Sequence, residues 1–196
     1  IGFDGFAAMI DQIGGLDVDC DQAEINFIND RISGGHGNEP EFVYFTEHVK
    51  GEPGIIHLNG AQCLIYARNR HTGTDGGSGN DYDRVNRQQE IIQLVFEKVT
   101  REMNEQSVLA LISFATGYVS TNMKLETMTE LAKLLLTKGM TFTKTAIPAA
   151  GTYSNYVDKE GTKTDMLEFD LDAAAAELNA LLYGDSFVPT PTPQPE

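Results

Sequence analysis

The chain has 196 residues, of which 41% are hydrophobic and 22% are charged, as is typical of a globular domain with one sizeable core. Its formal net charge of −15 argues against general nucleic-acid binding, because such binding depends on neutralising phosphates with a basic surface. The longest apolar runs, such as residues 108–113, are far too short to form a transmembrane helix.

The beginning of the chain alternates between helical and extended patterns. Apolar residues at helical spacing predict a helix over residues 3–13, which two glycines then end. Alternating apolar and acidic residues predict a short strand at residues 16–20. Asp21 is placed to cap a second helix.

A short extended segment and a short helix come next. Residues 55–58 follow a glycine-containing turn, and Asn59 is the expected cap of a helix that runs towards Arg68 and Arg70. The segment 71–80 has five glycines or serines and no apolar anchor, which predicts a glycine-rich loop.

The second half of the chain is predicted to be mostly helical. Helices are expected at residues 82–103, 106–119, 125–138 and 173–183, and strands at residues 140–147 and 166–169. The buried stripe of the first of these helices is assigned to six apolar residues, Val85, Ile92, Val95, Phe96, Val99 and Met103. This mixture predicts the α/β class, with a sheet that is short of strands for so many helices.

Four arginines lie within 20 positions, although the whole chain has only 14 lysines and arginines. Arg84 and Arg87 are three residues apart on a predicted helix and share a face with Gln88. They lie in its first two turns, where free backbone N–H groups and the helix dipole favour an anion. With Arg68 and Arg70 they form a candidate pyrophosphate site, because arginine grips phosphate oxygens bidentately. A solvated polar face with ion pairs to neighbouring aspartates remains the alternative.

Three segments carry a family resemblance. Residues 58–70 read LNGAQCLIYARNR, residues 81–89 read DYDRVNRQQ, and residues 3–18 read FDGFAAMIDQIGGLDV. In order and spacing they resemble the LytR-CpsA-Psr family, whose corresponding segments are LnGeqALaYaRxR, DfgRxxRQq and fegfvdalGGvdv. On this resemblance the chain is the C-terminal part of such a domain.

The resemblance implies a fold, a reaction and a set of residues. The family fold is an α/β/α sandwich around a mixed sheet, and here it is expected to lack its N-terminal strands. The family binds polyprenyl-pyrophosphate lipids and moves a glycan phosphate, of teichoic acid or capsule type, onto peptidoglycan. The substrate-binding residues would be five, Arg68, Arg70, Arg84, Arg87 and Gln88. Asp81 and Arg84 would be catalytic, with Asp81 orienting Arg84 or moving protons.

The resemblance also implies a setting and a cofactor. Residues 1–186 would form the domain and residues 187–196 a proline-rich tail or linker. The reaction would use Mg²⁺, with metal ligands upstream of this chain. The protein would work on the extracellular face of the cytoplasmic membrane of a Gram-positive bacterium, held by an N-terminal anchor absent from this chain.

Other readings of the sequence stay open. The arginines are also compatible with a non-catalytic module that binds pyrophosphate lipids or anionic glycans, with a pyrophosphatase, and with a purely structural domain. The only two cysteines, Cys20 and Cys63, are expected to be buried free thiols, because cysteine is among the most often buried residues.

Overall fold

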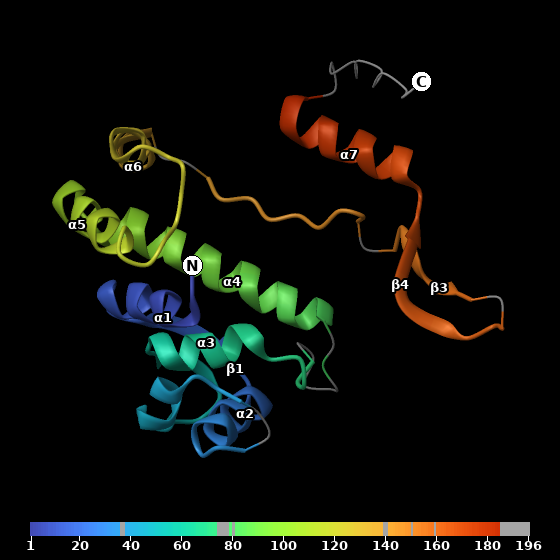
Figure 1. The fold of residues 1–196 in the computed structure, drawn as a ribbon, viewed down its shortest axis with the longest axis horizontal. Coiled ribbons are helices and arrows are strands. Elements are labelled where there is room, and N and C mark those ends of the chain that lie inside the picture. The colour runs from blue at the N-terminus through green and yellow to red at the C-terminus, as the bar shows by residue number, and fades with distance from the viewer. Residues whose placement is uncertain are drawn as a thin grey trace. The chain divides into compact units, whose positions relative to one another are not determined.

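The computed structural model describes residues 1–35, 38–73, 79, 81–138, 141–149, 151–158 and 160–184. The chain divides into two compact units, Ile1–Phe142 and Thr143–Glu196 (Figure 1). The predicted proline-rich tail lies outside the described residues. None of the described helices has both the length and the apolar character needed to cross a bilayer.

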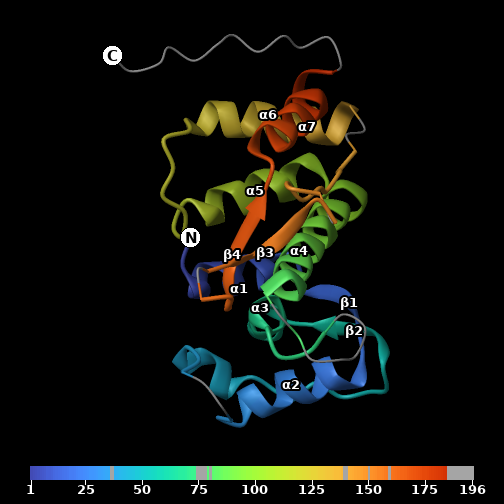
Figure 2. The same cartoon turned by 90° about the vertical axis from the view of Figure 1, so that its right-hand side faces the viewer.

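The first unit holds most of the helices. Its elements are α1 (Phe3–Gln12), β1 (Leu16–Cys20), α2 (Gln22–Ile32), the 3-10 helix η1 (Glu41–Phe45), β2 (Gly54–Leu58), α3 (Gly60–Arg68), α4 (Asp81–Glu102), α5 (Glu105–Ala115) and α6 (Leu125–Lys138). Figures 1 and 2 both show α4 lying over α3, and α3 lying beside α1.

The core of the first unit is built around β1, β2 and α3. The two strands pair antiparallel from Leu16 opposite Leu58 to Cys20 opposite Gly54. Alternate residues of β1 are buried, as a strand with one face on a core requires. Eight of the nine residues of α3 are buried, so this helix is enclosed on all sides.

Side-chain caps begin two of the helices that surround this core. Asp21 accepts a hydrogen bond from the Glu24 backbone N–H at 2.8 Å, while Glu24 accepts one from the Asp21 N–H at 3.0 Å. Asn59 and Gln62 form the same reciprocal pair at the start of α3. These pairs satisfy backbone N–H groups that the first turn of a helix leaves free, so both predicted caps are confirmed.

The second unit is smaller. It comprises β3 (Tyr153–Val157), β4 (Lys163–Phe169) and α7 (Leu171–Tyr183), and its two strands pair antiparallel. Asp170 caps α7 by accepting hydrogen bonds from the N–H groups of Asp172 and Ala173, both at 3.0 Å. The chain therefore combines helices with short strands, which confirms the α/β class.

One predicted strand was wrong, and one observed strand was missed. The described residues 141–147 belong to no helix or strand, although their alternation had predicted a strand. Most of them are exposed, and β-branched residues favour a strand only where a partner strand and a packed face support it. Tyr153–Val157, which had carried no prediction, forms β3 instead.

The buried stripe predicted for α4 was also partly wrong. Val99 is buried, but Val85 is 37% exposed and Ile92 is 56% exposed. The fully enclosed positions near the start of the helix include Arg87 and Ile91, at 0% and 1% exposure. The helix therefore turns a face that carries an arginine towards the core.

Gly60 sets how closely α1 and α3 approach. Its N–H donates to the Asp11 carboxylate at 2.7 Å, and a Cβ on Gly60 would lie 2.0 Å from the Ala7 carbonyl oxygen. Backbone atoms are on both sides of this contact, so a side chain at position 60 has to push the two helices apart.

We therefore predict that Gly60→Ala lowers the free energy of unfolding by about 1–3 kcal/mol, the usual cost of overpacking a tight core. Urea denaturation measures this change. Gly117→Ala is the matched control, because the nearest atom to its new Cβ would be 3.5 Å away. Equal stabilities of the two variants would contradict the close approach of α1 and α3.

Candidate anion site at the start of helix α4

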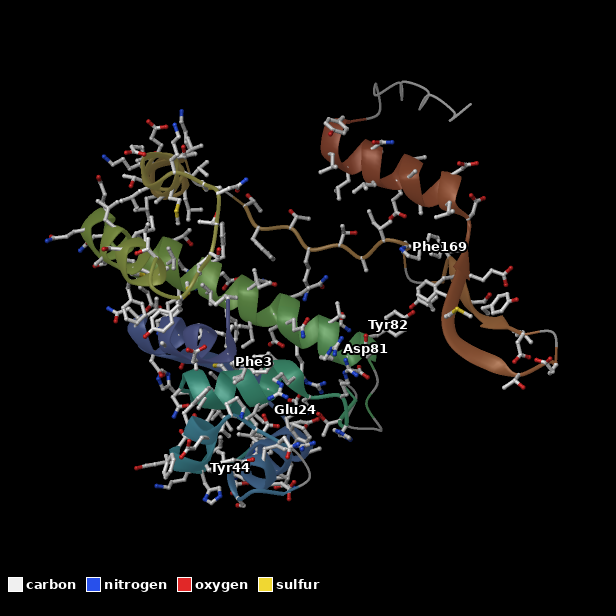
Figure 3. All side chains as sticks on the ribbon, in the orientation of Figure 1. Phe3, Glu24, Tyr44, Asp81, Tyr82 and Phe169 are labelled. Atoms are coloured by element: carbon white, nitrogen blue, oxygen red, sulfur yellow. The ribbon has the colours of Figure 1, made fainter. Side chains whose placement is uncertain are left out.

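Two of the predicted site arginines share one carboxylate. Asp81, labelled in Figure 3, is the first residue of α4, and its Oδ1 lies 3.1 Å from Arg70 Nε and 2.9 Å from Arg84 Nη2. Arg70 and Asp81 are more than half exposed. The structure thus brings Arg70, Asp81 and Arg84 together in an accessible position beside the N-terminal end of a long helix.

Arg84 has an N–H group for which the described residues provide no acceptor. Its side chain is 25% exposed, but its Nε is buried and has no hydrogen-bond partner within the described part of the chain. A buried donor without an acceptor costs free energy, so the local structure favours an acceptor from outside the protein. A phosphate oxygen is such an acceptor, and the positive end of the α4 dipole favours its charge.

Arg68 is engaged elsewhere. Its Nη1 contacts the Glu39 carboxylate, and its guanidinium lies over the Phe3 ring, 4.5 Å from the ring centroid. The Glu39 side chain is only 7% exposed, so this ion pair is partly shielded from water. Of the two arginines at the end of the segment 58–70, the structure groups Arg70, rather than Arg68, with Arg84.

Gln88 lies between the site and α3. Its side-chain amide donates to the Ala67 carbonyl at 3.3 Å, near the C-terminal end of α3. The residue itself is exposed. Gln88 is one turn after Arg84, so it remains on the same side of α4 as the candidate ligand.

Arg87 is buried and fully committed to the protein. Its Nε donates to Glu24 at 2.7 Å, its Nη1 to the Asn69 carbonyl at 3.3 Å, and its Nη2 to the Thr72 carbonyl and hydroxyl at 2.7 and 2.9 Å. Its side chain is 1% exposed. This geometry does not support the substrate-binding role predicted for Arg87, because a ligand has no access to its guanidinium.

The partners of Arg87 were missed by the sequence analysis. Glu24 lies 63 residues away, and no local pattern connects the two. The Asp-x-x-Glu spacing at the start of α2 gave a signal for a cap but none for an ion pair. Burial raises the pKa of the Glu24 carboxyl, and the hydrogen bond from Arg87 opposes that rise only in part.

Described residues line an acidic cavity and an apolar one. One, of about 460 Å³, is acidic, and its lining includes Asp19, Asp21, Glu24, Tyr66 and Glu90. Tyr66 donates to Glu90 at 2.7 Å, and its pKa is raised, first by burial and then by that hydrogen bond. The acidic lining makes this cavity unsuitable for a phosphate.

The other cavity, of about 470 Å³, is mainly apolar. It is lined by residues of α1, α5 and α6 and of the segment between the last two, among them Met9, Leu111, Ile112, Met123 and Met128. Such a lining suits a hydrocarbon chain and not a charged group.

The described residues do not gather a metal site. No three of their His, Cys, Asp or Glu side chains lie close enough together to hold a metal ion. Asp81 provides only one carboxylate, and that carboxylate already accepts from two arginines. The single carboxylate beside Arg70 and Arg84 therefore does not make a Mg²⁺ site, because Mg²⁺ prefers several oxygen ligands.

A model of the LytR_cpsA_psr family matches residues 1–173. The chain belongs to this family. The match covers all the elements of the first unit and both strands of the second, and it confirms the resemblance that the three sequence segments had indicated.

Several known proteins are similar to the chain. The polyisoprenyl-teichoic acid–peptidoglycan teichoic acid transferase TagV of Bacillus subtilis is 31% identical over 125 residues, which are 64% of this chain and 28% of that protein. Biofilm regulatory protein A of Streptococcus mutans is 32% identical over 135 residues, 69% of this chain and 29% of that protein. The chain thus spans less than a third of the length of these relatives.

The crystal structure of B. subtilis TagV resembles the chain with a TM-score of 0.62 and 21% identity, over 96% of this chain and 63% of that one. This similarity confirms the fold.

The two cysteines should be unreactive while the protein is folded. Burial raises the pKa of the Cys20 thiol to about 12, and burial also raises the pKa of Cys63. At pH 8 a thiol of that pKa is thiolate in only about one molecule in ten thousand.

We predict that Ellman's reagent modifies neither cysteine in native protein and both after denaturation. Rapid modification of either thiol in the native protein would contradict the burial described here.

Proposed function

We propose that this protein transfers a cell-wall glycopolymer, taking a glycan phosphate of teichoic acid or capsule type from a polyprenyl-pyrophosphate lipid to peptidoglycan. Membership of the LytR_cpsA_psr family supports this proposal, as does the similarity to a protein named as a teichoic acid transferase. The proposed place of work is the outer face of the cytoplasmic membrane of a Gram-positive bacterium.

The observation that carries the proposal is the unsatisfied Nε of Arg84 beside the shared Asp81 carboxylate. Two guanidiniums meet at an accessible helix N-terminus in a chain whose net charge is −15. Against such a background, a pyrophosphate is attracted only where cations are concentrated locally.

The proposed chemistry is a phosphoryl transfer. A hydroxyl oxygen of the acceptor forms a bond to the phosphorus that carries the glycan, and the bond from that phosphorus to the bridging oxygen breaks. Polyprenyl phosphate leaves with the bridging oxygen, and the hydroxyl proton is released. Arg84 and Arg70 stabilise the charge that develops on the bridging and leaving oxygens, since such reactions depend on positioning and charge neutralisation.

Asp81 has a positioning role in this scheme. By accepting from both guanidiniums it holds them on one side of the site, and the incoming pyrophosphate takes over part of that role. Its exposed carboxylate is also the group proposed to accept the proton of the acceptor hydroxyl.

Mg²⁺ dependence belongs to the proposal only as a contribution from outside the described residues. When bound, the metal would neutralise phosphate charge alongside the arginines. No step above depends on it, because the described donor groups do not fit the ion.

The apolar cavity supports a lipid-linked donor. α1 carries both Met9, which lines that cavity, and Phe3, whose ring lies under Arg68. The two contacts therefore involve the same short helix. The apolar lining is of the kind that a prenyl chain needs.

Replacing Arg84 should remove binding of the lipid head group without unfolding the protein. We predict that Arg84→Ala weakens the affinity for geranylgeranyl pyrophosphate by about 10- to 100-fold, the loss expected for a charged hydrogen bond. Titration calorimetry measures the affinity, and thermal unfolding checks the fold. The matched control is Arg101→Ala on the same helix, where Arg101 is 72% exposed and pairs with Glu97. If Arg84→Ala binds as tightly as the Arg101 variant and is equally stable, the assignment is wrong.

The role of Asp81 is tested by Asp81→Asn in the full-length protein. The variant should keep its affinity for the pyrophosphate lipid within a few fold, because it removes a negative charge from an anion site. Its rate of glycan transfer should fall at least about tenfold, since ordering and proton acceptance are both lost. A transfer rate equal to that of the wild type would exclude a catalytic role for Asp81.

The same assay separates the alternatives. Affinity for the pyrophosphate lipid without transfer would indicate a non-catalytic binding module. Release of a free sugar phosphate in place of a wall-linked product would indicate a pyrophosphatase.

A further inference from the structure

We propose that Arg87 is a positioning residue, which holds residues 69–72 so that Arg70 meets Asp81 and Arg84. This inference rests on the proposed function, because it takes the pair Arg70 and Arg84 as the anion site. It gives Arg87 a role in substrate binding that acts through another residue and not by contact with the ligand.

The contacts of Arg87 bracket Arg70 on both sides. Its Nη1 donates to the carbonyl of Asn69, the residue before Arg70, and its Nη2 donates to the carbonyl and hydroxyl of Thr72, two residues after it. Asn69 is 0% exposed and Thr72 is 8% exposed. Arg70 and His71 are the exposed residues between these two buried anchors.

The bracketed segment is also closed on itself. The Asn69 side-chain oxygen accepts from the His71 N–H at 2.9 Å and from the Thr72 N–H at 3.2 Å, and its amide donates to the Thr72 hydroxyl at 2.6 Å. An asparagine that bonds the backbone two and three residues on forms a tight turn. Arg87 therefore holds a turn that has its own internal hydrogen bonds, and Arg70 is part of that turn.

α4 carries both Arg87 and Arg84, the second arginine of the anion site. Arg84 and Arg87 are three residues apart, so a rigid turn of helix fixes their spacing. Because Arg87 ties that same turn to residues 69–72, the distance between Arg70 and Arg84 is set by the fold. Asp81, at the start of the helix, can then accept from both of them.

Glu24 confines the charge of Arg87 to the interior. One of its carboxylate oxygens accepts from Arg87 Nε at 2.7 Å and the other from the Asp21 N–H at 3.0 Å. The Glu24 side chain is 7% exposed. The pair is neutral overall, so Arg87 adds little to the field at the anion site, and its effect on binding has to be geometric.

The test separates positioning from stability. Arg87→Met alone leaves the buried Glu24 carboxylate unpaired, so its melting temperature should fall sharply. The double variant Arg87→Met with Glu24→Gln removes both charges, while the amide oxygen at position 24 can still accept from the Asp21 N–H in the cap of α2. We expect the double variant to melt near the wild-type temperature and yet to bind inorganic pyrophosphate at least about tenfold more weakly. Wild-type affinity in the stable double variant would overturn the inference.

A second variant covers the case in which the double variant does not fold. Arg87→Lys keeps a charge near Glu24 but has one nitrogen in place of a fork, and so cannot hold Asn69 and Thr72 together. It should remain folded and bind pyrophosphate about three- to tenfold more weakly, whereas wild-type affinity would overturn the inference.

The wild type and Arg84→Ala are measured beside these variants. If those two bind pyrophosphate equally, the proposed anion site fails and the positioning role fails with it. If the wild type binds pyrophosphate and Arg84→Ala does not, while the Arg87 variants bind as tightly as the wild type, then only the positioning role fails.

Discussion

The buried ion pair between Arg87 and Glu24 is the constraint on which the rest of the site depends. A guanidinium and a carboxylate taken out of water are costly unless each is paired and fully hydrogen-bonded. Here both conditions are met, because Arg87 donates to Glu24 and to two further residues, and Glu24 is held by the cap of its own helix. The pair ties α2 and α4 to the chain segment that follows α3. Removing one partner alone would leave the other charge buried and unpaired.

The side chains of the candidate anion site lie around this buried pair. Arg70 projects from the turn that Arg87 grips, Arg84 lies one turn before Arg87 on α4, and Asp81 joins them through one oxygen. Arg68, two residues before Arg70, pairs with Glu39 and lies over an aromatic ring. The four arginines of the two segments thus have different roles. Two are available to an anion, one is shielded by a carboxylate, and one is structural.

Local patterns in the sequence were enough to predict most helices, because caps and apolar spacing act within a few residues. They could not predict which face of α4 is buried. Val85 and Ile92 are exposed while Arg87 is enclosed, since the partner that allows its burial comes from a distant helix. Residues 141–147, part of the expected strand, form no strand. Strand propensity alone does not form a strand without a partner strand, and local patterns do not show whether such a partner is present. Motif resemblance located the arginines of the site, but their separate roles depend on contacts between segments far apart in the chain.

The central claim is that Arg70 and Arg84 form the anion site while Arg87 is structural. Nitrogen-15 NMR of the arginine Nε–H groups during a titration with inorganic pyrophosphate tests it most directly. We expect the Arg84 signal, from an Nε with no acceptor among the described residues, to shift most, and the Arg70 signal to shift with it. The Arg87 signal should stay fixed and exchange slowly with solvent, because its Nε–H is buried against Glu24. An Arg84 signal that does not move, or that moves no more than the exposed Arg101, would contradict the account.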